Sequence, residues 1–517
     1  MRIGILELLA ETWTTSWFQA TGYYLTRKQY ASIMPQAIAV WCRQMGHEAY
    51  YKTWYGVGDP KSSLPSDLDV VFIAAYTQVS PLAYALARLY AKEKTFTVLG
   101  GPHAKSFPHD SLRFFDLVVT QCDKALIADI LLGAFPKRTI VASDRMLTDI
   151  PTVEERLPEI KTSAFMRGKR PYLSTAVPLL SSVGCPYACN FCTDWNNPYA
   201  LLPLELLEKD LAFLTKHYPG VMVSFHDPNF AVKFDQTLNV LDAQPEGPRH
   251  PYIMESSLSV LRGPRLQRLK DTRCVYVAPG IESWADYSNK AGVGRITGAE
   301  KLRRVTEHIT ELHEYVPGIQ ANLIFGLDSD AGDEPVELTK EFLTQTPFAW
   351  PVINIPVPFG GTPLYDDHLK NGRMLKGMPF AFYYAPYLVT TLKNYEPAVY
   401  YEKLIEICQH LSTRKMLIRR LRTTPNAGLR ILHLVRTFAM RSRIRAYRQV
   451  HAMLTTDSQV RAYHEGRSDT LPEFYHREYE HMLGPYASLI SRADRTPELV
   501  PSSAPPPAAK VKLAERV

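Results

Sequence analysis

Hydrophobic residues in the first 134 positions follow two alternating spacings. Stretches with apolar residues three or four positions apart, such as 30–43 and 81–92, predict amphipathic helices. Continuous apolar runs, typical of buried parallel strands, occur at 2–6, 69–75, 95–100 and 116–120. Strands that alternate with helices predict βαβ units, and hence an α/β fold with a doubly wound, Rossmann-like parallel sheet over residues 1–134.

The pattern changes three times after residue 134. Residues 135–172, rich in Pro, Lys, Arg and Thr, predict a connector. Six further strand candidates, each followed by a helical stretch, predict a partial (β/α)6 barrel over 173–378; they lie at 178–183, 221–226, 252–257, 275–281, 320–325 and 353–356. Residues 379–494 predict a helical C-terminal domain, and the proline-rich residues 495–517 predict a disordered tail.

The composition is that of a globular protein. Of 517 residues, 46% are hydrophobic and 21% are charged, which is enough apolar material for a large core. No stretch approaches the roughly 18 apolar residues of a membrane-spanning helix. Glu7 and Glu11 interrupt the first apolar run, unlike a signal peptide. Seven cysteines, an odd number, argue against a secreted disulfide scaffold, so we expect a cytoplasmic protein.

The positive charge is concentrated in residues 411–448. The net charge is +7, and this segment holds eleven Lys or Arg with no Asp or Glu, whereas the rest of the chain holds 48 basic and 52 acidic residues. Apolar residues between the arginines make the segment basic and amphipathic. Three interpretations remain open: a helix docked through ion pairs, a peripheral membrane contact, or contact with an acidic ligand. Nucleic acid is not expected, because Phe438 and Tyr447 are the only aromatic residues there.

The most specific motif is a triad of cysteines, Cys185, Cys189 and Cys192, directly after a predicted strand. Three thiolates on one loop can hold three irons of a four-iron cluster and leave the fourth iron open to another ligand. A structural zinc ion would need a fourth ligand, and a disulfide is not expected in a cytosolic chain. Cys274 as a fourth ligand would close the cluster, but its place at the start of an apolar strand favours the core.

This triad, with Phe191 before its third cysteine, resembles that of the radical S-adenosylmethionine (SAM) superfamily. Four downstream phrases resemble family motifs in the same order, at 225–230 (FHDPNF), 280–283 (GIES), 322–327 (NLIFGL) and 358–365 (PFGGTPLY). Two positions in these phrases depart from the family pattern, since Asn322 stands where glycine is usual and Gly361 where proline is usual.

The resemblance implies the cofactors and the chemistry. A [4Fe-4S] cluster on the triad would bind SAM at its open iron and cleave it reductively, with electrons from reduced flavodoxin or ferredoxin. The resulting radical abstracts hydrogen from an unactivated carbon. The resemblance also implies six candidate residues for SAM binding, namely Phe191, Asp227, Glu282, Ser283, Asn322 and Gly326.

Residues 1–134 resemble the cobalamin-binding domain that precedes the barrel in one branch of this superfamily. The matching phrases are 98–103 (VLGGPH) and 115–119 (FDLVV), and Gly100 and Gly101 would let the backbone approach cobalamin. The family's acidic phrase is replaced by TQCD at 120–123, and the segment whose histidine binds cobalt in many cobalamin proteins is absent. The resemblance implies cobalamin without such a histidine, with a domain that binds nothing as the alternative.

Together these features predict methyl transfer to an unactivated carbon of a small, hydrophobic or polycyclic substrate. The alternative is a radical cyclase or rearrangement enzyme without net methyl transfer. A methylthiotransferase would need three cysteines in the N-terminal domain, which has only Cys42 and Cys122. A non-enzymatic sensor would need a DNA-binding module, which we do not find in the sequence.

Overall fold

A six-stranded parallel sheet forms the N-terminal part of the protein in the computed structural model, which describes residues 1–502 except 30, 169, 173–174, 246 and 248. The strand order is β2-β1-β3-β4-β5-β6. The strands are β1 (Arg2–Leu8), β2 (Glu48–Trp54), β3 (Val70–Ala75), β4 (Phe96–Gly100), β5 (Leu117–Gln121) and β6 (Thr139–Ala142). The helices are α1 (Trp17–Thr26), α2 (Ile33–Gln44), α3 (Ser80–Lys92), α4 (Pro102–Ser106), α5 (Pro108–Leu112), α6 (Lys124–Leu131) and α7 (Val153–Ser163).

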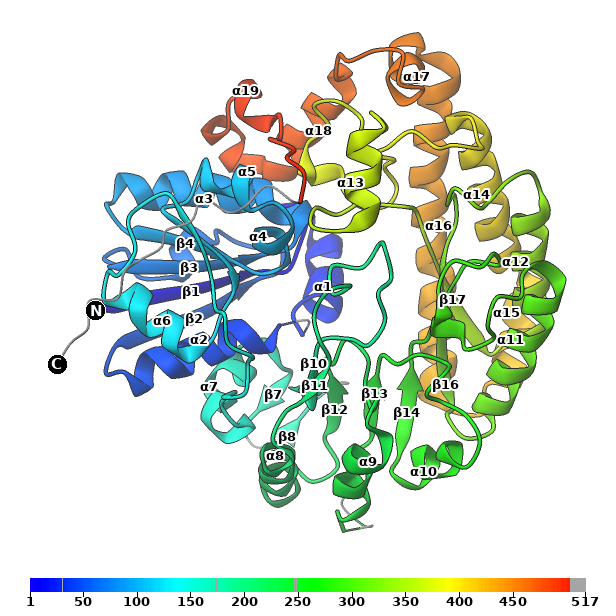
Figure 1. The fold of residues 1–517 in the computed structure, drawn as a ribbon, viewed down its shortest axis with the longest axis horizontal. Helices are drawn as coiled ribbons and strands as arrows, with labels where there is room; N and C mark the ends of the chain where they lie inside the picture. The colour runs from blue at the N-terminus through cyan, green and yellow to red at the C-terminus, as the bar shows by residue number, and fades with distance from the viewer. Residues whose placement is uncertain (30, 169, 173–174, 246, 248, 503–517) are drawn as a thin grey trace.

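Helices cover both faces of this sheet, with α2 and α6 on one side and α3 on the other (Figure 1). The continuous apolar strands supply both layers: Val70 and Phe72 of β3 belong to one hydrophobic cluster, and Val71 and Ile73 belong to the other. The strand order reverses between β1 and β3, and at such a point the carboxyl edge of a doubly wound sheet opens a crevice for a ligand. The predicted α/β fold class is confirmed.

Two segments of the chain differ from the sequence-based expectation. The strand β2 was not predicted, and the segment 135–172, expected to be a connector, contains β6 and α7. Both strands lie at the edges of the sheet, where a strand has one neighbour and needs fewer apolar residues. The first sheet therefore extends to Ala142.

The second sheet is a partial barrel of parallel strands. Its order is β15-β16-β14-β13-β12-β9, with β17 on the other side of β16. Because β14 and β15 pair with successive parts of β16, they act as one interrupted strand, and the sheet has the six positions that the sequence predicted. The strands are β9 (Ala176–Leu179), β12 (Met222–Phe225), β13 (Tyr252–Met254), β14 (Cys274–Val277), β15 (Gly280–Glu282), β16 (Gly318–Ile324) and β17 (Ala349–Asn354).

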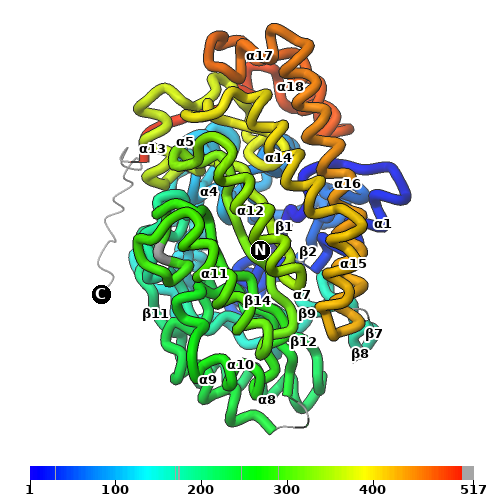
Figure 2. Tube along the Cα trace, turned by 90° about the vertical axis from the view of Figure 1, so that its right-hand side faces the viewer, coloured from blue at the N-terminus to red at the C-terminus, as the bar shows by residue number. Residues whose placement is uncertain are grey.

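Helices connect these strands and surround the barrel (Figures 1 and 2). They are α8 (Leu204–His217), α9 (Phe234–Asp242), α10 (Arg265–Asp271), α11 (Gly298–His313), α12 (Glu334–Gln345) and α13 (Pro363–Lys370). Two short hairpins flank the first barrel strand, β7 (Met166–Arg167) with β8 (Arg170–Pro171), and β10 (Ser182–Val183) with β11 (Ala200–Leu201).

The C-terminal region is helical, as predicted. Its helices are α14 (Pro397–Leu411), α15 (Arg414–Thr423), α16 (Ala427–Thr456), α17 (Ser458–His464), α18 (Glu473–Leu483) and α19 (Arg492–Arg495). The 30-residue helix α16 is about 45 Å long at 1.5 Å per residue, and it runs along one side of the barrel (Figure 1).

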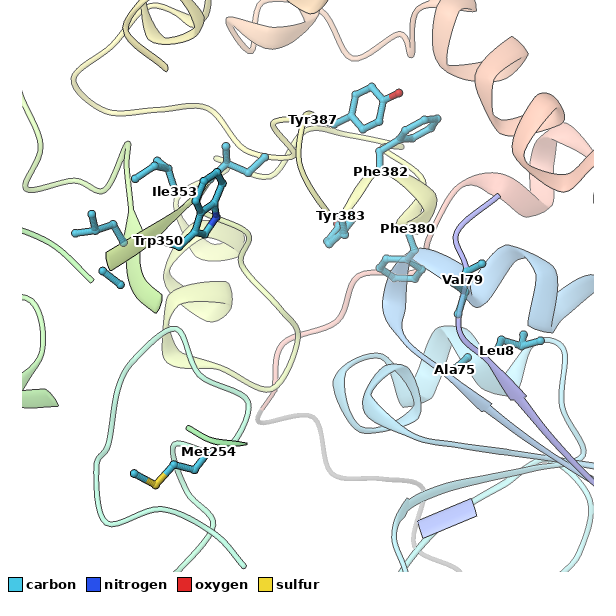
Figure 3. Packing of buried hydrophobic residues seen from close by; sticks show 14 of the residues in the cluster. Leu8, Ala75, Val79, Met254, Trp350, Ile353, Phe380, Phe382, Tyr383 and Tyr387 are labelled. Carbon is cyan, nitrogen blue, oxygen red and sulfur yellow. The ribbon is translucent and has the colours of Figure 1, made fainter. Parts of the chain in front are cut away.

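The N-terminal domain and the C-terminal region share one hydrophobic core. The 3₁₀ turn at Phe380–Phe382 meets the turn at Thr77–Val79 that follows β3, and Figure 3 shows Phe380 next to Val79. The ring of Phe380 lies 4.1 Å from that of Phe107, measured between centroids. This packing holds the carboxyl edge of the first sheet against the C-terminal region.

Residues 496–502 are ordered and continue this junction. The amide of Glu498 donates to Asp110, and the carbonyl of Val500 accepts from the Tyr365 hydroxyl. The amide of Ser502 donates to Asp366. The part of the predicted disordered tail that precedes residue 503 is thus bound to the fold, while residues 503–517 lie outside the described residues.

Candidate cofactor site

The cysteine loop leaves the first barrel strand through a tight turn at Gly184. This residue has a φ of +67°, and a Cβ there would lie 2.1 Å from the carbonyl oxygen of Pro198, so only glycine fits. The amide of Cys185 donates to the carbonyl of Asn197 over 3.1 Å, which closes the loop from 185 to 197. The triad therefore lies at the carboxyl edge of the barrel, on a loop closed at its base.

Asp227 fixes the chain just before this turn. Its carboxylate accepts hydrogen bonds from the Ser181 amide (3.1 Å), the Ser181 hydroxyl (2.6 Å) and the Ser182 hydroxyl (2.5 Å). Burial raises the pKa of Asp227, and these hydrogen bonds lower it. A role for Asp227 in SAM binding stays a prediction, whereas its present contacts position the strand that leads to the cysteines.

The three thiols of the triad share one electrostatic environment. Cys185 and Cys189 are buried and Cys192 is partly buried. Burial raises the pKa of Cys189 to about 11, and the nearby ammonium group of Lys290 lowers the pKa of both Cys189 and Cys192. This cation also interacts with Cys185, so it would offset the negative charge of an iron-sulfur cluster on three thiolates.

The donor set fits a cluster better than a single ion. Among the described residues, no group of three or more His, Cys, Asp or Glu side chains is close enough to hold one metal ion. A four-iron cluster places its irons at alternate corners of a cube, each with its own ligand, and three cysteines on one loop suit that spacing. Cys274 lies in the core at the start of β14, with 2% exposure, as the sequence predicted.

Glu282 and Ser283 lie at the carboxyl end of β15. Glu282 has a φ of +66° and is buried, and burial raises its pKa to about 6. The Ser283 hydroxyl donates to Asp330 over 3.4 Å. Asp330 also accepts the amides of Gly326 (2.9 Å) and Leu327, so it joins two of the predicted SAM-binding segments.

Gly326 and Asn322 keep β16 close to its neighbours. Gly326 has a φ of +101°, and a Cβ there would lie 2.6 Å from the ring of Tyr400. The Asn322 side chain accepts from Gln320 over 3.0 Å and donates to the carbonyl of Ala278 over 3.4 Å. The contact with Tyr400 explains why no residue larger than glycine fits at 326. SAM binding by Gly326 or Asn322 stays a prediction.

An aromatic pair and two unpartnered hydroxyls lie beside the triad. Phe191 stacks on Tyr287 with their centroids 5.3 Å apart. Among the described residues, the buried oxygens of Tyr287 and Ser288 have no hydrogen-bond partner, which is costly without a ligand. A polar ligand next to the cysteines would supply those partners, and the site therefore fits SAM.

Four residues of this site were missed from the sequence. Tyr287 and Lys290 share the loop after β15, whereas Asp330 follows β16 and Glu255 follows β13. Glu255 interacts electrostatically with Lys290 and Glu282, but the predicted strand at 252–257 placed it inside a strand and so hid its position at the carboxyl end. The other three carry no sequence signal.

The N-terminal domain places its glycine pair next to the cysteine loop. Gly101 has a φ of +88° and begins α4, where Lys105 forms an ion pair of 3.0 Å with Asp194. Asp194 lies two residues after Cys192. At Gly360 a Cβ would lie 2.0 Å from the carbonyl of Ser106, so α4 also contacts the loop after β17.

His103 faces away from this edge. Its Nε2 is 2.6 Å from the Tyr84 hydroxyl, which donates to Asp110, and its ring packs against Phe380. Burial lowers the pKa of His103 to about 3. The histidine after the glycine pair is therefore a neutral core residue, and the edge of the sheet remains accessible to a ligand at Gly100, where a Cβ would meet no atom within 4 Å.

Residues 179–342 match the radical SAM superfamily. The chain contains a radical SAM domain. Its cofactors accordingly include a [4Fe-4S] cluster and SAM, and ligation of the cluster by Cys185, Cys189 and Cys192 stays a prediction.

Two curated relatives align with more than half of this chain. A bacteriochlorophyllide d C-12(1)-methyltransferase from Chlorobaculum tepidum is 23% identical over 319 residues, which cover 59% of this chain and 67% of the relative. A hopanoid C-2 methylase from Rhodopseudomonas palustris is 25% identical over 294 residues, covering 54% of this chain and 53% of that protein. The chain thus spans about half of the second relative.

A solved structure of the radical SAM methyltransferase TsrM from Kitasatospora setae, with cobalamin and a [4Fe-4S] cluster bound, has a TM-score of 0.47 to this protein. The two are 13% identical, and the match covers 72% of this chain and 78% of that one. No helix among the described residues is both long and apolar enough to span a membrane.

Proposed function

We propose that this radical SAM enzyme transfers a methyl group from SAM, through cobalamin, to an unactivated carbon of a hydrophobic small molecule. The relatives named as a methyltransferase and a methylase both support this function. The observation that carries the proposal is the ion pair between Lys105 and Asp194, because it brings the ligand edge of the N-terminal sheet against the cysteine loop.

The protein's own residues would hold each cofactor in place. When bound, the cluster and SAM supply radical chemistry at an unactivated carbon, and cobalamin supplies a transferable methyl group. Cys185, Cys189 and Cys192 would ligate three irons. Gly100 would let a corrin approach the strand ends, and the shared core around Phe380 would keep the two cofactors facing each other and exclude water.

Two products of SAM distinguish this proposal from a radical cyclase or rearrangement. The protein, reconstituted anaerobically with iron, sulfide and hydroxocobalamin and then desalted, should retain about one cluster and one corrin by absorbance. With SAM and reduced flavodoxin or ferredoxin it should release both S-adenosylhomocysteine, after loss of the methyl group, and 5′-deoxyadenosine. Release of 5′-deoxyadenosine alone from corrin-loaded protein would favour the rearrangement.

The triad provides the control for this experiment. Replacement of any one cysteine of the triad by alanine should remove cluster absorbance and 5′-deoxyadenosine release. Cys408→Ala alters a buried cysteine of α14 outside the site and should retain both. Cleavage of SAM by a triad variant would contradict the ligand assignment.

We also propose that the outward face of α15 and α16 contacts an anionic membrane surface. Exposed apolar residues share this face, namely Ile418, Ile431, Leu434, Val435 and Phe438, each between 39% and 66% exposed. None of the eleven basic residues of 411–448 forms an ion pair with a carboxylate of the described residues, which argues against docking through ion pairs. Figure 2 shows α1, with Trp17 and Phe18 at 80% and 82% exposure, on the same side as α16.

Vesicle flotation tests this contact. The protein should float with vesicles that contain phosphatidylglycerol and remain below with neutral phosphatidylcholine vesicles, because basic residues bind anionic lipid. The triple substitution Ile431→Ser, Val435→Ser and Phe438→Ser should abolish flotation. Leu132→Ser, at an 83% exposed position of the N-terminal domain, is the matched control. Equal flotation of the triple variant would exclude this face.

A further inference from the structure

The opposite face of α16 places an arginine inside the barrel. Arg436 donates to the Tyr276 hydroxyl over 2.6 Å and to the side-chain oxygen of Gln320 over 3.4 Å. Its guanidinium lies over two aromatic rings, 5.5 Å from the Tyr276 centroid and 5.7 Å from that of Trp350. Tyr276, Gln320 and Trp350 belong to the neighbouring strands β14, β16 and β17, so Arg436 contacts all three strands.

This arginine is adjacent to the candidate SAM site. Gln320 and Asn322 share one face of β16, because side chains two residues apart point the same way. That face is opposite to the buried Ile319 and Ala321. Gln320 donates to Asn322 over 3.0 Å, so a short hydrogen-bonded path leads from Arg436 to a predicted SAM residue.

The surroundings of Arg436 hold more positive charge and no counter-charge. Arg420 is 1% exposed, lies 4.9 Å from the Trp350 centroid and donates only to the neutral Thr437 hydroxyl and a carbonyl. Its Nε has no partner among the described residues. Burial, together with the positive charges of Arg420 and Arg436, lowers the pKa of His433 to about 4.

Other buried arginines of this protein are compensated. Arg156 lies near Asp210 and Glu159, and Arg495 pairs with Glu480 at 2.9 Å. Arg420 is buried and Arg436 is partly buried, and neither forms an ion pair with a carboxylate of the described residues. Because a positive charge that is removed from water without a counter-charge is costly, this part of the barrel favours the entry of an anion.

We propose that Arg436 binds an anionic oxygen, of a carboxylate or a phosphate, on the substrate that is methylated. The rings of Tyr276 and Trp350 both lie near the guanidinium, whose N–H groups suit a bidentate anion. Tyr276 and Gln320 orient the guanidinium of Arg436. Arg420, which also lies near the Trp350 ring, adds a second positive charge that attracts the anion. This inference rests on the proposed function, since it names a feature of the substrate at the same site.

Binding of simple amphiphiles tests the inference without knowledge of the substrate. Octanoate, octyl phosphate and the neutral octanol, each below its micelle concentration, would be titrated calorimetrically into the reconstituted holoenzyme. We expect one of the anions to bind about tenfold more tightly than octanol. A stronger preference for octanoate identifies a carboxylate, and a stronger preference for octyl phosphate identifies a phosphate.

The variants locate that preference. Arg436→Gln should reduce the ratio of anion affinity to octanol affinity to about one, and Arg436→Lys should retain part of the preference. Arg445→Gln, at an exposed position of the same helix, should leave the ratio unchanged. Equal binding of anion and alcohol by the wild type, or an undiminished preference in Arg436→Gln, would overturn the inference. Release of both S-adenosylhomocysteine and 5′-deoxyadenosine, measured without amphiphile on the same preparations, shows separately whether the proposed function holds.

Discussion

Gly100 and Gly101 are consecutive in the chain but have different surroundings. Gly101 has a φ of +88°, which disfavours a side chain, and a Cβ there would lie 3.0 Å from the amide nitrogen of Ala75. A Cβ at Gly100 would meet no atom within 4 Å. The first glycine thus leaves space at the edge of the sheet, and the second is required by the backbone.

Substitution separates these two roles. Gly100→Val should retain the wild-type melting temperature but lose corrin absorbance after reconstitution and desalting, because the added methyl groups occupy the ligand side. Gly101→Val should lower the melting temperature by several degrees, since it combines backbone strain with a close contact. Normal corrin retention by a folded Gly100→Val variant would contradict a cobalamin site at this edge.

Glu7 gives the stability of the protein a predictable pH dependence. This carboxyl group is buried at the end of β1, where it accepts hydrogen bonds from the Ser32 amide and the Tyr51 hydroxyl. Burial raises its pKa from 4.5 to about 7. Between these values the unfolded chain is ionised while the folded protein keeps the proton, so the free energy of unfolding falls as the pH rises.

The size of this loss is about 3 kcal/mol between pH 4.5 and pH 7. Glu7→Gln removes the titration, so its free energy of unfolding relative to wild type should rise by that amount over the interval. Urea unfolding at a series of pH values measures the difference. A constant difference across the interval would show that Glu7 is not protonated in the folded protein.

Sequence reasoning identified residues that stand in motifs and missed those that come together only in space. The cysteine triad and Glu282 could be found because their neighbours in the chain form recognisable phrases. Lys290 could not, because its relation to the cysteines depends on a loop about a hundred residues away. Asp227 was found, but the hydrogen bonds from Ser181 and Ser182 that surround it could not be predicted from its motif.

At the level of elements, the central strands were predictable and the edge strands were not. The run at 69–75 is apolar throughout because β3 is covered on both faces. In β2 only Tyr51 and Trp54 are fully buried, so the strand reads as a polar segment. The four-residue β6 lies among Pro, Lys and Arg, which hid it within an expected connector.

The contact between α4 and the barrel depends on the absence of a side chain at 360. Gly360→Ala should push α4 away from the loop after β17, because the new Cβ would overlap the Ser106 carbonyl. We expect faster amide hydrogen exchange in 102–106 and 190–195 and a several-fold loss of S-adenosylhomocysteine release. Gly22→Ala is the matched control, because Gly22, like Gly360, has no positive φ, but its Cβ meets no atom within 4 Å. Similar effects in both variants would exclude a specific role for this contact.

At the scale of the whole molecule, the last described residues join the N-terminal domain to the barrel. Asp494 pairs with Arg88, Glu498 is held by Asp110, and Ser502 is held by Asp366 next to α13. These contacts connect parts of the chain that are distant in sequence. Tyr365, which donates to the carbonyl of Val500, also packs against Phe107 of the junction around Phe380.

Truncation tests this connection. A chain that ends at residue 495 should have a lower melting temperature and a lower corrin content than the full protein, because the two domains lose a shared segment. A chain that ends at residue 502 keeps every contact described for the tail and should match the full protein. Equal melting temperatures for both truncations would show that residues 496–502 add nothing to the junction.

The two faces of α16 constrain how this helix can change during evolution. Its outward face carries the exposed apolar residues Ile431, Val435 and Phe438, and its inward face carries His433, Arg436 and Thr437. Each residue turns the helix by about 100°, so a single insertion before Arg436 would rotate the guanidinium out of the barrel and carry an apolar side chain in. Descendants of this sequence can therefore exchange residues within α16, or gain and lose whole turns at its ends, but they cannot shift its frame by one position.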